Sequence, residues 1–204
     1  EGNGFSTIGP EEWLAHPGSV GRSILGVVHI LDEDGRELPN GEAGQIWFES
    51  PHSFSYHGDA EKTSSAHNDR GWATLGDMGY LDDEGFLFIV DRQSDMVISG
   101  GVNIYPAEIE AVLLQHPAVH DAAVIGLPNE EWGEEVRAVV EPAEGVVPGP
   151  ELERELLDWC KDRIAKYKTP KKIDFIAEMP RDPNGKLYKR KLRDPHWEGR
   201  ERSI

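Results

Sequence analysis

One stretch of the sequence decides the fold. It reads Asp91-Arg92-Gln93-Ser94-Asp95-Met96-Val97-Ile98-Ser99-Gly100-Gly101-Val102-Asn103-Ile104-Tyr105-Pro106-Ala107-Glu108-Ile109-Glu110. Its first five residues are a charged break, and Met96–Ile98 is a short apolar strand. Pro106 then opens a helix with acidic side chains in its first turn and an apolar face that begins at Ile109. Because the periodicity changes from strand to helix here, we expect a boundary between two structural units.

The sequence before this stretch is rich in strands and turns. Strands are predicted over residues 27–31, 45–49 and 86–90. The turn clusters 32–35 and 82–85 each end in a glycine, which tolerates the positive φ of a hairpin turn. Residues 1–23 and 51–71 are predicted to be irregular, the latter with one helical turn near 60–62. The first unit is therefore predicted to be β-rich.

After the stretch, helical and strand patterns alternate. Strands are predicted over residues 119–125, 136–140 and 173–176, and an amphipathic helix over 149–166. Residues 179–193 are predicted to be a polar loop followed by a short basic helix. The second unit is therefore predicted to be a small α+β domain with a three-stranded sheet and helices.

The composition excludes several classes of protein. The 204 residues contain 21 Lys and Arg against 38 Asp and Glu, which gives a formal net charge of −17. That charge argues against a nucleic-acid partner, and the sequence has no apolar run long enough for a membrane span. Cys160 is the single cysteine, so a disulfide scaffold is excluded. The basic segment 161–193 indicates either a small anionic ligand or a solvated basic face.

Three segments, in this order, resemble the acyl-adenylate-forming (AMP-binding) enzyme superfamily. They are Leu75-Gly76-Asp77, the stretch 91–110 and the segment from Pro180 to Lys189. The superfamily includes acyl-CoA synthetases, adenylation domains of non-ribosomal peptide synthetases, and luciferases. This chain departs from the family pattern at Leu75, where the family has Thr, at Asp91, where it has Gly, and at Ser94, where it has Asp or Lys.

The resemblance implies a domain organisation. Residues 1–93 would be the C-terminal portion of the AMP-binding N-terminal domain, which is the end of the large adenylation domain. Residues 94–95 (Ser94 and Asp95) would be a hinge, and residues 96–204 a mobile C-terminal domain. The chain starts with Glu1 and has neither the family's phosphate loop nor its acyl pocket. We therefore expect a C-terminal fragment that is inactive alone.

The resemblance also implies site residues and ligands. The parent enzyme would use ATP and Mg²⁺ to convert a carboxylic acid to acyl-AMP, and would then pass the acyl group to coenzyme A. The implied residues are Lys186 as the catalytic cation, Asp77 and Arg92 for ATP or AMP, Ser99, Gly100 and Gly101 for the coenzyme A channel, and Glu1 for Mg²⁺.

The motif Gly100–Pro106 favours the acyl-CoA synthetase branch, because peptide-synthetase domains carry a more charged motif at this place. Two alternatives stay open. One is an adenylation domain that loads a carrier protein, and the other is a non-catalytic binding module with the same fold. Because the sequence shows no targeting segment, we expect a cytoplasmic protein. Trp132 and Trp159 are predicted to pack, and Cys160 to be an inert thiol.

Overall fold

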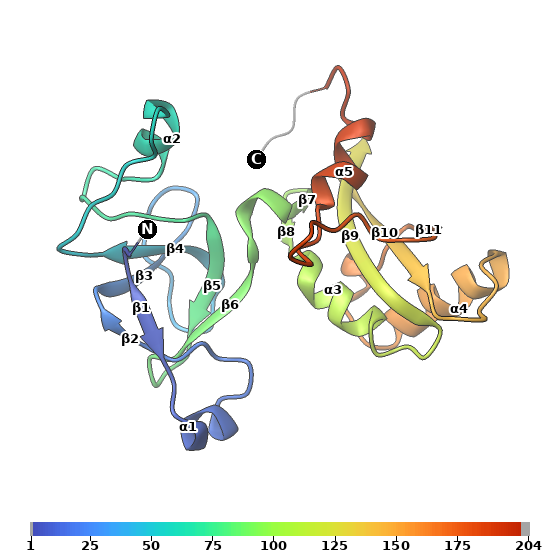
Figure 1. The fold of residues 1–204 in the computed structure, drawn as a ribbon, viewed down its shortest axis with the longest axis horizontal. Coiled ribbons are helices and arrows are strands. Elements are labelled where there is room, and N and C mark those ends of the chain that lie inside the picture. The colour runs from blue at the N-terminus through green and yellow to red at the C-terminus, as the bar shows by residue number, and fades with distance from the viewer. Residues whose placement is uncertain (1, 201–204) are drawn as a thin grey trace. The chain divides into compact units, whose positions relative to one another are not determined.

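The computed structural model describes residues 2–200 and contains helices and mixed sheets, which confirms the predicted α+β class. The chain divides into two compact units, Glu1–Gln93 and Ser94–Ile204. Figure 1 shows the first in blue to green and the second in green to red. In the part that the structure describes, no helix has the length and apolar character needed to cross a membrane.

The first unit is built mainly from antiparallel strands. A two-stranded sheet pairs β1 (Phe5–Thr7) with β2 (Arg22–Leu25). A four-stranded sheet has the order β3 (Val27–Leu31), β4 (Gly44–Glu49), β5 (Asp77–Leu81) and β6 (Leu87–Arg92). Two short helices, α1 (Pro10–Ala15) and α2 (Ala60–Ser65), lie outside the sheets. The strands β3 and β4 and the turn at 82–85 are as predicted, whereas β1, α1 and β2 replace the irregular segment expected over residues 1–23.

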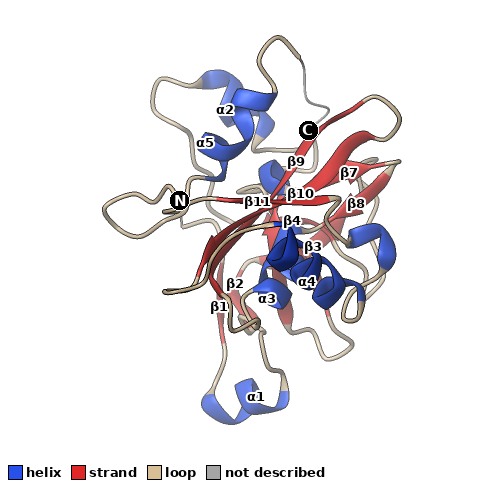
Figure 2. Cartoon of the chain, turned by 90° about the vertical axis from the view of Figure 1, so that its right-hand side faces the viewer, coloured by secondary structure: helices blue, strands red, loops and turns tan. Residues whose placement is uncertain are grey.

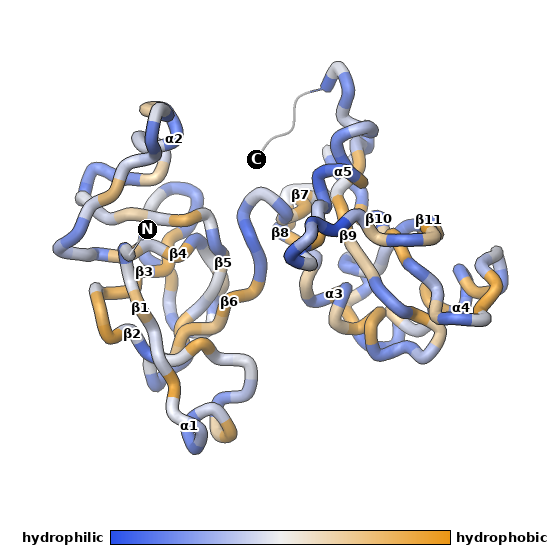
Figure 3. The backbone as a smooth tube through the Cα atoms, in the orientation of Figure 1, coloured by the Kyte–Doolittle hydropathy of each residue, from blue (hydrophilic) through white to orange (hydrophobic). Residues whose placement is uncertain are grey.

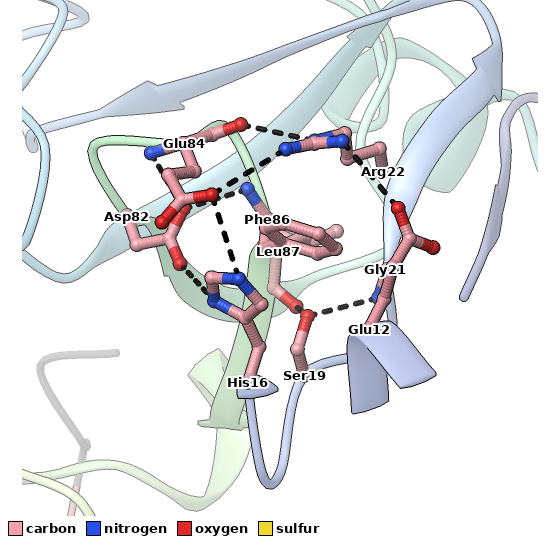
Figure 4. A network of polar contacts seen from close by, with 9 residues as sticks. All are labelled: Glu12, His16, Ser19, Gly21, Arg22, Asp82, Glu84, Phe86 and Leu87. Atoms are coloured by element: carbon pink, nitrogen blue, oxygen red, sulfur yellow. Dashed lines mark hydrogen bonds and ion pairs between the residues drawn. The ribbon is translucent and has the colours of Figure 1, made fainter. Parts of the chain in front are cut away.

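A polar network holds the segment after α1 against the β5–β6 turn (Figure 4). The Oδ1 atom of Asp82 accepts the backbone N–H groups of Glu84 and Phe86, and its Oδ2 atom lies 2.9 Å from Nδ1 of His16. The ring of Phe86 is 1% exposed, stacks on the His16 ring at 3.8 Å, and lies under the Arg22 guanidinium. Burial alone would raise the pKa of Asp82, but these hydrogen bonds outweigh it and lower that pKa.

The second unit contains a five-stranded sheet. Its strands are β7 (Val97–Ser99), β8 (Val102–Ile104), β9 (Val119–Asn129), β10 (Gly133–Pro142) and β11 (Lys172–Phe175). Strand β10 pairs along its length with β9, in parallel with β11, and at Gly133 with β7, which in turn pairs with β8. The prediction of three strands was wrong, because the turn at Gly100-Gly101 folds β7 and β8 into a hairpin that joins the sheet.

Up to residue 200, this unit is completed by three helices and by three 3₁₀ turns, the first of which begins at Gln93 of the first unit. They are η1 (Gln93–Asp95), α3 (Pro106–Leu113), α4 (Pro150–Lys161), η2 (Lys166–Lys168), α5 (Lys189–Arg193) and η3 (Asp194–His196). The helix predicted over residues 149–166 ends at Lys161, because the chain leaves the helix at Asp162 and continues into η2. The short basic helix after the polar loop is found as α5.

Both faces of this sheet are covered (Figures 2 and 3). Along β9, Ala122 and Val124 face the core that α3 and α4 complete, whereas Ala123 and Ile125 face a second cluster. That second cluster is closed by Met179 and by side chains of the C-terminal segment, including Leu187 and Leu192. Burial on both faces explains why the sequence of β9 reads as a continuous apolar run.

Cys160 is part of the core on the α4 side. Its side chain is fully buried, and burial raises the pKa of the thiol to about 11. A thiol of that pKa is overwhelmingly protonated near neutral pH and is a poor nucleophile. These properties are those expected of an inert packing residue.

Candidate functional site

Asp77 and Arg92 lie side by side in the first unit. Asp77 begins β5 and Arg92 ends β6, and the two residues are direct partners in the antiparallel ladder. The Nε atom of Arg92 lies 3.6 Å from Oδ1 of Asp77, while the Asp77 side chain remains 32% exposed. The preceding Gly76 has a φ of 80°, which is the conformation that turns the chain into β5. The fold thus places a partly exposed carboxylate next to a guanidinium.

Ser94 and Asp95 lie in η1, where the chain passes from the first unit to the second. The predicted break over residues 91–95 is too long, because β6 continues through Asp91 and Arg92. A β-bulge between Met78 and Gly79 keeps Asp91 in register with its partner strand. The break between β6 and β7 is therefore confined to residues 93–96.

Ser99, Gly100 and Gly101 form the turn of the β7–β8 hairpin. Ser99 pairs with Val102, so Gly100 and Gly101 are the two turn residues, with φ values of 60° and 78°. Positive φ at both positions is the requirement of a type I′ turn. A Cβ atom on Gly100 would lie 2.6 Å from Cε3 of Trp132, whereas nothing lies within 4 Å of one on Gly101. The indole of Trp132 thus occupies the space beside Gly100, and only Gly101 stays open to approach.

Lys186 is carried by a loop with a well-defined backbone. The Oδ1 atom of Asp182 accepts the N–H groups of Asn184 and Lys186 at 2.8 and 2.9 Å. The Arg181 guanidinium donates to the carbonyl of Gly185 and also pairs with Asp121 of β9. Within residues 94–200, the ammonium group of Lys186 has no hydrogen-bond or ion-pair partner, and the residue is exposed. The loop therefore presents an uncompensated positive charge from a fixed backbone.

The second unit holds Ser94, Asp95, Ser99, Gly100, Gly101 and Lys186, and the first unit holds Asp77 and Arg92. Glu1, the residue expected to hold Mg²⁺, lies outside the described residues. In the range 2–200, no three His, Cys, Asp or Glu side chains are grouped as a metal site would require.

Three contacts that matter to this geometry were not indicated by the sequence, although Trp132 was predicted to pack and Arg181 lies in the segment from Pro180 to Lys189. Trp132 packs on Gly100, Arg181 fixes the Gly185 carbonyl, and Arg193 binds the carbonyl of Ser94. The signal for Arg181 was its place in the segment from Pro180 to Lys189, and the signal for Arg193 was the basic character of segment 161–193. No sequence signal pointed from Trp132 to Gly100, because the β9–β10 hairpin brings them together.

Residues 108–186 match the family described as the AMP-binding enzyme C-terminal domain. This part of the chain is therefore similar to the C-terminal domain of acyl-adenylate-forming enzymes. The resemblance inferred from the three sequence segments is thereby confirmed. The matched range ends on Lys186 and begins after Ser99–Gly101.

Among curated relatives, the chain is 40% identical over 187 residues to a 2-succinylbenzoate–CoA ligase of Bacillus cereus (strain Q1). It is 39% identical over 188 residues to a 2-succinylbenzoate–CoA ligase of Bacillus subtilis (strain 168). Each alignment covers 92% of this chain but 38% of the relative. The chain thus spans well under half the length of the relatives that it matches.

Solved structures of related sequence have the same fold as this chain over the matched region. The o-succinylbenzoate CoA synthetase (MenE) from Bacillus subtilis, in complex with the acyl-adenylate OSB-AMP, has a TM-score of 0.81 at 37% identity. That match covers 98% of this chain and 40% of the other. The ATP-bound MatB from Rhodopseudomonas palustris has a TM-score of 0.78 at 38% identity, covering 88% of this chain and 36% of the other.

Proposed function

We propose that the protein containing this chain is an ATP-dependent acid–thiol ligase of the acyl-CoA synthetase type. In the first half-reaction, a carboxylate oxygen attacks the α-phosphorus of ATP, and the bond to pyrophosphate breaks to give acyl-AMP. In the second, the thiol of coenzyme A attacks the acyl carbon, loses its proton, and releases AMP. The observation that carries this proposal is the exposed ammonium group of Lys186, on a loop whose backbone is held by hydrogen bonds to the Asp182 carboxylate.

The first half-reaction brings an anionic carboxylate to an anionic triphosphate. A cation at the reacting phosphorus lowers the barrier, because negative charge moves onto the phosphoryl oxygens in the transition state. Lys186 suits that role, since its backbone is held by Asp182 and Arg181 while its ammonium is uncompensated in the second unit. A preorganised charge contributes more than one that must be ordered during the reaction.

Asp77 and Arg92 suit the nucleoside part of ATP. A partly exposed carboxylate accepts two ribose hydroxyl hydrogens, and a neighbouring guanidinium donates to ribose or phosphate oxygens. Mg²⁺ commonly accompanies such triphosphate chemistry and is held by carboxylate oxygens and phosphates. Glu1 is the candidate ligand in this chain.

The second half-reaction needs the coenzyme A thiol to reach the acyl-AMP. We assign this approach to the Ser99–Gly101 turn, on which Gly101 has open space and Gly100 is already packed by Trp132. In this proposal, residues 1–93 belong to the AMP-binding domain and residues 96–204 form a domain that rotates between the half-reactions. The division of the chain into two compact units at Gln93/Ser94 supports such a rotation.

The acid is proposed here only as a class. Relatives named for 2-succinylbenzoate are 40% identical to this chain, yet an anthranilate CoA ligase and an amide bond synthetase are 32% and 36% identical. Proteins named for different reactants thus share this region to a similar degree. We therefore expect the acid to be selected outside it, and 2-succinylbenzoate is the first acid to test.

The test uses the full-length protein. We expect acid-dependent ATP–pyrophosphate exchange over a panel of carboxylic acids, followed by thioester formation with coenzyme A. The change Lys186→Ala should reduce the exchange rate by about 10²–10³. It should leave thioester formation from pre-formed acyl-AMP nearly unchanged. The matched control is Lys166→Ala, which removes another exposed lysine of the same unit and should leave both rates unchanged.

Three outcomes would contradict the proposal in different ways. Absence of exchange with every acid would favour a non-catalytic binding module. Exchange followed by transfer only to a carrier-protein thiol would favour the peptide-synthetase alternative. Wild-type exchange by the Lys186→Ala protein would remove Lys186 from the catalytic role.

A further inference from the structure

The carbonyl of Ser94 is bound by a side chain from the far end of the second unit. Arg193, the last residue of α5, donates from Nη1 to this oxygen at 2.8 Å across 99 residues of sequence. Its Nε and Nη2 atoms donate to Oδ1 of Asp194 at 3.1 and 3.0 Å, and Oδ1 of Asp95 lies 3.9 Å from Nη1. The Arg193 side chain is only 17% exposed. This guanidinium therefore ties Ser94 and Asp95 to the second unit.

Gln93, one residue earlier, is tied to the first unit instead. Its backbone N–H donates to the carbonyl of Gly76 at 2.8 Å. Its side-chain Oε1 accepts from Nε2 of Gln45, on β4, at 3.0 Å. The backbone from the Gln93 nitrogen to the Ser94 carbonyl is thus hydrogen-bonded to the first unit at its start and to the second unit at its end.

The start of α5 is also fixed. Nζ of Lys189 lies 2.7 Å from Oε1 of Glu110 on α3, and the two side chains are 12% and 15% exposed. The same Glu110 oxygen accepts the N–H of Val124 on β9 at 2.6 Å. Leu192 packs into the second cluster, on the face of the sheet opposite α3 and α4. Helix α5 is therefore anchored at its start by Lys189, three residues after Lys186, and ends at Arg193 on the Ser94 carbonyl.

We propose that Arg193 is a positioning residue that clamps the Ser94 carbonyl and Asp95 to the second unit, so that the expected rotation takes place in the backbone between the Gln93 nitrogen and the Ser94 carbonyl. The inference rests on the proposed function, which requires the rotation. It moves the pivot one residue toward the N-terminus from the expected pair Ser94–Asp95, because Asp95 lies on the clamped side. It also makes α5 the link between the pivot and the Lys186 loop.

The test compares Arg193→Ala, Arg193→Lys and the control Lys191→Ala in the full-length protein. Lys191 lies on the same helix, is exposed, and places its ammonium group over the Tyr188 ring. Losing a hydrogen bond from a charged donor should speed amide hydrogen exchange at residues 94–98 by about tenfold or more in Arg193→Ala. Exchange in β9 and β10 should not change, which separates a loosened pivot from general destabilisation.

The kinetic arm measures both half-reactions. In Arg193→Ala we expect kcat of each half-reaction to fall by about tenfold while KM for ATP stays within about twofold, because Arg193 positions a domain and binds no substrate. Arg193→Lys keeps one N–H donor for the Ser94 carbonyl and should recover part of the rate. If Arg193→Ala does not fold, the comparison of Arg193→Lys with Lys191→Ala decides.

The inference would be overturned if the Arg193 variants matched Lys191→Ala in two measurements. These are the amide hydrogen exchange at residues 94–98 and the kcat values of both half-reactions. Faster exchange spread equally over β9 and β10 would overturn it as well, because it would show a structural role only. If the wild-type protein forms no adenylate, the proposed function fails instead. The hydrogen-exchange arm then still decides whether Arg193 clamps Ser94.

Discussion

At the scale of single residues, the two glycines of the β7–β8 turn serve different purposes. Both have positive φ, so an alanine at either place costs about 1 kcal/mol or more of backbone strain. At Gly100, a Cβ would also meet the Trp132 ring at 2.6 Å, a contact that requires the ring to move. Gly101 has no atom within 4 Å of such a Cβ.

We therefore expect Gly100→Ala to lower the free energy of unfolding more than Gly101→Ala does. The expected difference between the two variants is about 1–3 kcal/mol. Urea unfolding of the 204-residue chain measures both changes. Adding Trp132→Ala to each glycine variant is the control, and the additional cost at Gly100 should largely disappear in that background. Equal costs at the two glycines would show that Trp132 exerts no steric demand there.

Single-residue contacts also mark where sequence interpretation ends. Asp77 and Lys186 are predicted as site residues because each lies within a short motif whose order along the chain is informative. The contact from Arg193 to Ser94 spans 99 residues, so it depends on how α5 packs rather than on any local pattern. Likewise, Gly100 could be recognised as a turn residue, but its packing against Trp132 depends on the pairing of β10 with β7.

At the scale of elements, the turns at 32–35 and 82–85 and the short strand β7 follow the prediction, whereas the short strands β1, β2 and β8 were not predicted. The turn before Phe86 carries Asp82 and Gly85, whose hydrogen bonds and positive φ follow from residue type. Strand β8 has three residues and gains its place from pairing with β7, which a three-residue window cannot indicate. Helix α1 is six residues long with no buried residue, so no apolar periodicity marks it.

The edge of β10 that pairs with β11 carries a charged triad. Arg137 donates to Oε1 of Glu135 at 2.8 Å and to Oδ2 of Asp174, on β11, at 2.9 Å. The hydrogen bond from Arg137 lowers the pKa of Glu135 against the opposing effect of burial. Burial raises the pKa of Asp174, but the bonds from Arg137 and Lys172 outweigh it and lower that pKa.

Because both folded-state pKa values lie below the ordinary values of 4.5 and 3.8, the triad stabilises the fold fully above about pH 5. That contribution is lost as the pH falls through the folded-state values. We expect the free energy of unfolding to fall by about 1–2 kcal/mol on acidification below pH 4, discounted for partial exposure.

Urea titrations at pH values between 3 and 7 measure this loss. The double change Glu135→Gln and Asp174→Asn should flatten the acid limb, whereas Glu144→Gln, at an exposed position, should not. An unchanged acid limb in the double variant would assign the loss to other carboxylates.

At the scale of the whole molecule, the two units differ in how completely they bury their apolar side chains. The core of the second unit joins residues of β7 to β11 with α3 and α4, and a second cluster covers the opposite face. The main cluster of the first unit joins Ile30, Ile46 and Leu87. In that unit, Leu14 is 74% exposed and Ile24 is 70% exposed. Since apolar burial is the main favourable term in folding, the second unit should be the more stable one.

This difference predicts the order in which the 204-residue chain opens. Amide hydrogen exchange should be slowest in β9 and β10. These strands are buried on both faces, and ten residue pairs join them, from the pair Gly133–Asn129 to the pair Pro142–Val119. It should be fastest in β1 and β2, whose two-stranded sheet carries the exposed Phe5 and Ile24. A denaturant series should remove protection from residues 1–93 first, at a concentration where β9 and β10 are still protected. Simultaneous loss of protection in both units would mean that they unfold as one cooperative body, and a pivot at Gln93 and Ser94 would then have to act within a single folding unit.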